Sequence, residues 1–185
     1  DVYRIARGIY VPRQIAPDHQ TYAAEVGIRF PEALICLRSA AELHGLTLEF
    51  RADVFLAQKL DWRPIPARLG NEVDGLRRIY WARWHQHGLE KGIMSMEVHG
   101  VPIKVTTPAR TVVDYFRYRN KAIFGKEERM MVLDRYLSRR SMREYDTELF
   151  DLAATFGVKQ HLSLLVEGRR DLVMRRADPF LKAGF

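Results

Sequence analysis

The stretch 95–120 constrains the fold most, because it combines a tight turn with a sharply started helix. His99 and Gly100 separate two β-prone runs, and Gly takes the positive φ that a two-residue hairpin turn requires. Pro108 then suits the first helical position, where its missing N–H costs nothing. The sequence therefore predicts a β-hairpin that leads directly into a helix over 107–120.

Two faces of this predicted helix differ in chemistry. The apolar residues recur at i, i+3, i+4 and i+7 and form one packing stripe, namely Ala109, Val112, Val113 and Phe116. Three charged residues fall together on another face, namely Arg110, Asp114 and Arg117. This polar face either contacts a partner or holds an ion pair of Arg110 with Asp114 that organises the helix.

Charge and size narrow the classes of function. The 185 residues allow one large domain or a domain with a small appendage, and 47% of them are hydrophobic, enough for a core. The formal net charge of +7 points to acidic partners, with nucleic acid first and protein second. Many basic proteins bind no nucleic acid, so the charge alone does not decide between these partners.

The lone cysteine and the lack of long apolar runs indicate in which cellular compartment the protein is expected. Cys36 has no partner for an intrachain disulfide, which fits a reducing cytoplasm. No run approaches the roughly 18 apolar residues of a membrane span, and no secretory signal is visible. We therefore expect a soluble cytoplasmic protein with no membrane partner.

The N-terminal part is predicted to be a ribbon and a linker. Residues 1–12 show the pattern of a short basic β-ribbon that ends at Pro12. Because Asp1 already lies in a strand-like pattern, we expect that an N-terminal part has been removed. Residues 13–31 are polar and irregular apart from a helical turn expected over 22–26, and they are predicted to be a linker.

A helix is predicted next, over 32–45. Its apolar residues recur at helical spacing, and Gly45 is a suitable stop. Arg38 and Ser39 are expected on its wetter side. His44, in the last turn, is interpreted as a packed side chain rather than a catalytic one.

A strand over 76–84 interleaves arginines with aromatic residues. Arginines pair with phosphates and aromatic rings stack on bases, so this pattern is typical of a nucleic-acid surface. An edge strand with its aromatics inward and its arginines outward produces the same pattern. The candidate DNA-binding residues here are Arg77, Arg78 and Arg83.

Together these elements predict an α+β fold. A small, mainly antiparallel sheet from 46–106 is packed by the helices at 33–45 and 107–120, and a helical C-terminal region follows. The predicted domains are a ribbon at 1–12, a linker at 13–31 and a main domain at 32–185, divided into an α+β core at 32–121 and a helical part at 122–185.

No catalytic constellation is visible. There is no Gly-rich phosphate loop, and an HxH at 85–87 lacks a third metal ligand. Asp53, Glu97 and Lys104 are the only candidates for metal-dependent nuclease chemistry, and their spacing matches no familiar arrangement. We therefore expect a non-enzymatic binding protein with no metal and no cofactor, while a nuclease stays the less favoured alternative.

Three stretches read together resemble one family. RIARGIYVP (4–12) resembles the end of the wing in a winged-helix module, and ALICLRSAAELHGLT (33–47) resembles the helix that opens the next domain. HGVPIKVTTPARTVVDYFRYRNK (99–121) resembles the most distinctive block of the AbiEi-like antitoxins of type IV toxin–antitoxin (abortive infection) systems. The order and spacing match across most of 1–165.

The resemblance implies a two-part protein. In this family an N-terminal winged helix-turn-helix binds the operator DNA of its own operon, and a C-terminal antitoxin domain antagonises a cognate nucleotidyltransferase-like toxin. Only the wing-like ribbon matches this part of the family, so we expect the helix-turn-helix to be missing from this sequence. Arg4 and Arg7 match the wing and are candidate DNA contacts. A transcriptional regulator without a toxin partner is the main alternative.

Overall fold

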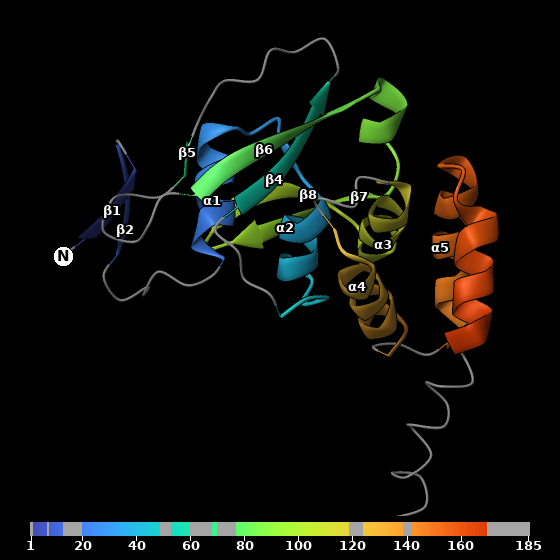
Figure 1. The fold of residues 1–185 in the computed structure, drawn as a ribbon. Helices are drawn as coiled ribbons and strands as arrows, with labels where there is room; N and C mark the ends of the chain where they lie inside the picture. Colours follow the sequence, from blue (N-terminus) through green and yellow to red (C-terminus); the bar gives the residue numbers. More distant parts are fainter. Residues whose placement is uncertain are drawn as a thin grey trace, which may run out of the picture. The chain divides into compact units, whose positions relative to one another are not determined.

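The structure is a computed structural model of the chain, and it describes residues 2–6, 8–12, 20–48, 53–59, 68–69, 77–118, 124–138 and 142–169. The chain forms two compact units, Asp1–Thr107 and Pro108–Phe185 (Figure 1). The strands lie in the first unit, which we call the sheet unit, and the second is helical. The predicted division at residue 121 thus differs from the observed one.

A two-stranded ribbon begins the chain. β1 (Val2–Ala6) pairs with β2 (Ile9–Pro12) in antiparallel register. The turn contains Gly8 at φ +80°, a backbone conformation that glycine adopts without strain. The predicted β-ribbon over 1–12 is therefore present.

Among the described residues, the main sheet has six strands in the order β5-β6-β4-β3-β8-β7 (Figure 1). The strands are β3 (Leu34–Ile35), β4 (Asp53–Lys59), β5 (Arg68–Leu69), β6 (Arg77–Trp84), β7 (Ile93–Val98) and β8 (Val101–Thr106). Three of the five pairings are antiparallel, whereas β4 with β6 and β3 with β8 are parallel. The predicted α+β class with a mainly antiparallel sheet is confirmed.

The hairpin predicted around His99 and Gly100 is formed by β7 and β8. Val98 pairs with Val101, so the loop contains two residues, as the sequence predicted. His99 and Gly100 have φ values of 50° and 78°, and positive φ at both central positions defines the turn type that matches the twist of the strands.

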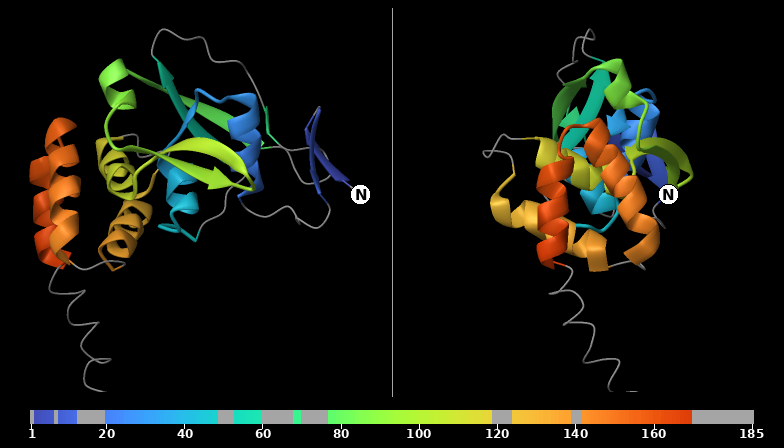
Figure 2. Two further views of the ribbon diagram at one scale, coloured as in Figure 1. Left: turned by 180° about the vertical axis from the view of Figure 1, so that it is seen from behind. Right: turned by 90° about the vertical axis from the view of Figure 1, so that its right-hand side faces the viewer.

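Helix α1 (Thr21–Arg29) lies within the range 13–31 that was predicted to be a linker, so the prediction is wrong for these residues. Tyr22, Ala23 and Val26 are buried in the main core, together with side chains of the sheet. Gly27 lets the helix approach β8, because a Cβ there would lie 2.8 Å from the carbonyl oxygen of Pro102. The left view of Figure 2 shows α1 beside the β7–β8 hairpin.

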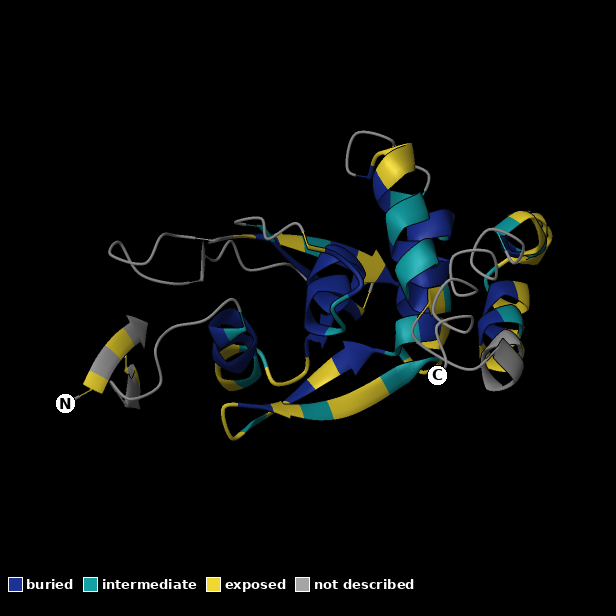
Figure 3. Ribbon diagram, turned by 90° about the horizontal axis from the view of Figure 1, so that it is seen from below, coloured by how far each residue is buried: buried dark blue, intermediate teal, exposed yellow. Residues whose placement is uncertain are grey.

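The predicted helix over 32–45 is two elements. Leu34 and Ile35 form β3, which bridges β4 and β8, and α2 (Leu37–Leu43) starts only after it. The expectation that α2 has a wetter side is also wrong, because all seven of its residues are buried. Figure 3 shows the helix in dark blue. A short 3₁₀ helix, η1 (Gln86–Leu89), joins β6 to β7.

The second unit contains α3 (Pro108–Arg117), α4 (Lys126–Ser138), α5 (Met142–Thr155) and a helical segment at 159–169. α3 packs against α4 and α5 within this unit. Tyr115 of α3 donates a hydrogen bond to Glu128 of α4 at 3.1 Å, and the centre of its ring lies 4.5 Å from that of Phe124 in a tilted contact. Arg169 and Asp134 form an ion pair between the helical segment at 159–169 and α4.

Among the residues that the structure describes, no helix combines the length and apolar content needed to cross a bilayer.

Candidate functional site

The predicted DNA-binding arginines do not share one surface. Arg4 is exposed on β1, and Arg7 lies outside the described residues, as does the side chain of Arg77. Arg78 and Arg83 are both exposed on β6, but they are an odd number of residues apart, so they point to opposite faces of the sheet. The arginine pattern of 76–84 therefore does not build a single basic patch.

β6 is also not a simple edge strand. It lies between β5 and β4, although β5 pairs only with its first two residues. The aromatic residues differ in burial: Trp84 is buried, Trp81 is half-buried, and Tyr80 is exposed. Tyr80 stacks on Phe55 of β4 and accepts a 3.4 Å hydrogen bond from Arg78. These contacts stabilise the sheet.

Arg38 and Ser39 hold α2 in the core. The Ser39 hydroxyl accepts a 2.9 Å hydrogen bond from the backbone N–H of Phe55, and its carbonyl accepts one of 3.1 Å from Tyr22 Oη. The Arg38 guanidinium lies 5.7 Å from the centre of the Phe55 ring. Both side chains are buried, so their position favours a structural role over a partner contact.

His44 ties the end of α2 to the end of β8. Its Nε2 donates a 2.6 Å hydrogen bond to the carbonyl oxygen of Thr106. This contact agrees with the interpretation of His44 as a packed side chain.

Arg110 and Asp114 form a buried ion pair on α3. Arg110 Nε lies 3.0 Å from both carboxylate oxygens of Asp114, and neither side chain is exposed. Burial raises the pKa of Asp114 to about 6, although Arg110 and Arg117 act to lower it. The Phe156 ring lies against both cations. Its centre is 3.8 Å from the guanidinium carbon of Arg110 and 5.0 Å from that of Arg117. This geometry favours the organising ion pair.

The nuclease candidates do not converge. Lys104 of β8 lies level with Leu34 of β3 and Ala57 of β4, which are register partners. Asp53 is displaced from that level by four residues toward one end of the sheet, and Glu97 by two toward the other. At about 3.3 Å per residue, roughly 20 Å separates the two carboxylates along the strands alone. A shared metal cannot bridge them.

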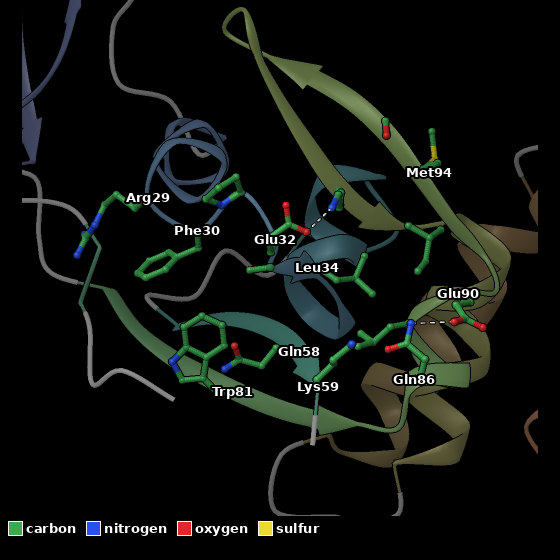
Figure 4. Close-up of a pocket in the computed structure, with 16 residues that line it drawn as sticks. Arg29, Phe30, Glu32, Leu34, Gln58, Lys59, Trp81, Gln86, Glu90 and Met94 are labelled. Carbon is green, nitrogen blue, oxygen red and sulfur yellow. Dashed lines mark hydrogen bonds and ion pairs between the residues drawn. The ribbon is translucent and has the colours of Figure 1, made fainter. Parts of the chain in front are cut away.

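A pocket of about 900 Å³ lies in the sheet unit, at the short central strand β3. β4 continues for two residues beyond the pairing partner of Leu34, whereas β3 does not, so the sheet opens there. Figure 4 shows Leu34 near the middle of the lining, with Phe30 and Trp81 at one end and Gln86 and Glu90 at the other. The phenyl and indole rings meet edge to face at 5.5 Å.

Most charges of the pocket are already neutralised. Lys104 donates a 2.9 Å hydrogen bond to Glu32 at the rim, which lowers the pKa of that carboxyl group. Arg29 forms a 2.6 Å ion pair with the buried Glu25. Lys59 and Glu90 also line the pocket. No ion pair of the Lys59 ammonium group is found within the described part of the chain, and Glu90 accepts a 2.8 Å hydrogen bond from Gln86.

Gln58 is the polar residue that sequence reasoning missed. Its side chain is 9% exposed and lines the pocket, yet its Nε2 has no hydrogen-bond partner among the described residues. A glutamine followed by a lysine at the end of a buried strand was the available signal, but the opening beside β3 depends on long-range pairing.

Comparisons with known proteins leave the site unassigned. No protein-family model matches this sequence, and no curated protein sequence matches it. No group of three or more His, Cys, Asp or Glu side chains suited to a metal ion occurs within the described ranges.

Proposed function

We propose that this protein is an antitoxin of a type IV toxin–antitoxin system, of the AbiEi-like kind. It antagonises a nucleotidyltransferase-like toxin in the cytoplasm without enzymatic activity of its own. With a complete winged helix-turn-helix, it also binds operator DNA and represses its own operon.

The proposal is supported by how the three family-like stretches coincide with folded elements. The wing-like residues 4–12 overlap the β1–β2 ribbon, and 33–47 contain β3 and α2. The distinctive block at 99–121 spans the β7–β8 turn, β8 and α3. Arg110 and Asp114 of this block form the buried ion pair, so the folded helix needs both residues of the block together.

DNA binding is proposed for the ribbon rather than for the sheet. Arg4 is exposed on β1, and a guanidinium on a wing is suited to contact phosphate oxygens. Such contacts position a protein on DNA, while base contacts specify the sequence. The recognition helix that would supply those base contacts belongs to the full-length protein in this proposal.

The antitoxin function is tested by co-expression. The full-length protein is expressed with the nucleotidyltransferase-like toxin encoded by the adjacent gene, and growth is followed against cells that carry the toxin alone. Recovery of growth supports the proposal. Growth arrest that persists despite expression of the full-length protein contradicts it.

A transcriptional regulator without a toxin partner is the second candidate. The pocket at β3 favours it, because a regulator with a sensor domain needs a cavity for an effector. The neighbouring gene discriminates: a nucleotidyltransferase gene supports the antitoxin, and its absence supports the regulator.

A further inference from the structure

We propose that the pocket at β3 binds a small planar aromatic anion. Its ring lies against Phe30 and Trp81, a hydrogen-bond acceptor on it meets Gln58, and its negative charge lies near Lys59. This site is independent of both the antitoxin function and the DNA contacts.

The buried amide of Gln58 carries the inference furthest. A buried N–H without a partner destabilises a folded protein, so native structures rarely leave one. Gln58 Nε2 is such a group, and the side chain lines the pocket at only 9% exposure. In Figure 4 the amide lies beside Trp81. An acceptor bound in the pocket would satisfy this donor.

One cation of the lining favours an anion. Arg29 and Lys104 are already engaged by carboxylates, whereas the described residues give Lys59 no such partner. The remaining carboxylate, Glu90, accepts a 2.8 Å hydrogen bond from Gln86 at the end of the pocket away from Trp81. Lys59 follows Gln58 at the end of β4, and both residues line the pocket. Hydrogen bonds from a charged donor to an anion are about twice as strong as neutral ones.

The shape of the pocket favours a ring. Phe30, Trp81 and Leu34 give one end and the middle of the lining an apolar character. The volume of about 900 Å³ lies inside the range of small-molecule sites. Two sources of this chemistry fit, an aromatic carboxylate and a nucleoside monophosphate.

The binding test separates ring from charge. Indole-3-carboxylate and uridine 5′-monophosphate are titrated into the chain by calorimetry, with indole and inorganic phosphate as probes that lack the charge or the ring. We expect saturable binding of at least one aromatic anion, with a Kd at least about tenfold lower than those of indole and phosphate, and which anion binds identifies the source.

Two variants locate the binding. Gln58→Leu removes the donor and should raise the Kd about fivefold to tenfold, and Lys59→Gln should raise it about tenfold. Gln160→Leu and Lys126→Gln are matched controls at exposed helical positions outside the pocket and should leave the Kd unchanged. Because Lys59 is exposed, its variant keeps the test informative if Gln58→Leu folds poorly.

Thermal unfolding of the free chain gives an independent reading. Gln58→Leu removes an unsatisfied buried donor, so its Tm should exceed that of the wild type while its affinity falls. The proposal is overturned if neither aromatic anion binds with a Kd below about 1 mM. It is also overturned if both are bound equally well by the wild type, Gln58→Leu and Lys59→Gln.

Discussion

Arg110 donates from a single nitrogen to both carboxylate oxygens of Asp114, and both side chains are withdrawn from solvent. A buried pair of this kind is costly to break, because the remaining charge stays buried without its counterion. Arg110 and Asp114, at the centre of the family-like block, therefore stabilise α3 within the helical unit.

Replacing Arg110 by methionine should strongly destabilise the protein at neutral pH. Asp114 would remain buried without its cation, and such a change costs about 3–5 kcal/mol. Arg117→Met on the same helix is the control, since Arg117 is half-buried and its cation–π contact with Phe156 is worth about 1 kcal/mol or less. Urea denaturation measures both. Equal losses for the two variants would contradict the role given to the pair.

The pKa of Asp114 predicts a pH dependence of stability. Its folded value of about 6 lies above the value near 3.9 of an unfolded chain, so between the two only the folded state holds the proton. Stability from this group is fully present below about pH 4 and is lost as the pH rises through about 6. Relative to Asp114→Asn, the free energy of unfolding should fall by up to about 1.4 kcal/mol per pH unit in that window. A constant difference between about pH 4 and about pH 6 would disprove this.

Gly27 should tolerate no side chain. A Cβ at this position would lie 2.8 Å from the Pro102 oxygen and from a methyl carbon of Val101, so Gly27→Ala should destabilise the sheet unit by about 1–3 kcal/mol. Gly168→Ala is the matched control in a helix, because nothing lies within 4 Å of its added Cβ. That control should be neutral or stabilising by up to about 1 kcal/mol. A thermal shift of the same sign in both variants would argue against the close contact.

Arg4 should contribute to DNA affinity through phosphate. In the full-length protein, Arg4→Ala should weaken operator and unrelated DNA alike and reduce the slope of log affinity against log salt by about one. Lys126→Ala, at an exposed position on α4, is the control for loss of one positive charge. Fluorescence anisotropy over a series of salt concentrations measures the slope. Binding that is insensitive to salt would refute the basic-ribbon interpretation.

Local signals predicted the hairpin and α3 correctly. The turn at His99 and Gly100 depends on backbone preferences, and Pro108 marks a helix start without long-range information. The strand β6 also follows from the local pattern over 76–84. The sequence failed where pairing is decided across the fold.

Leu34 and Ile35 illustrate that limit. A short apolar run fits a buried strand as well as a helix, and only pairing with β4 and β8 makes it a strand. The full length of α1 was missed because the polar composition and the flanking prolines suggest a loop, although Tyr22 and Val26 are spaced for one helical face. Arg38 and Ser39 were expected near water, yet both are buried, where Ser39 accepts a hydrogen bond from Phe55 and Arg38 lies over the Phe55 ring.

Sequence patterns could not predict the candidate pocket either, because it also depends on long-range strand pairing. Gln58 and Lys59 are the last two residues of β4. They line the pocket at the point where β3 does not extend alongside β4. The ion pair of Arg110 with Asp114, in contrast, follows from their i, i+4 spacing on one helix.

Growth of cells that co-express the adjacent-gene toxin and the full-length protein tests the central proposal most directly. We expect the wild type and Gly168→Ala to restore growth, and Gly27→Ala to restore it poorly in proportion to its loss of folded protein. Continued arrest in the presence of folded, full-length wild type, verified in the same cells, would contradict the assignment as an antitoxin.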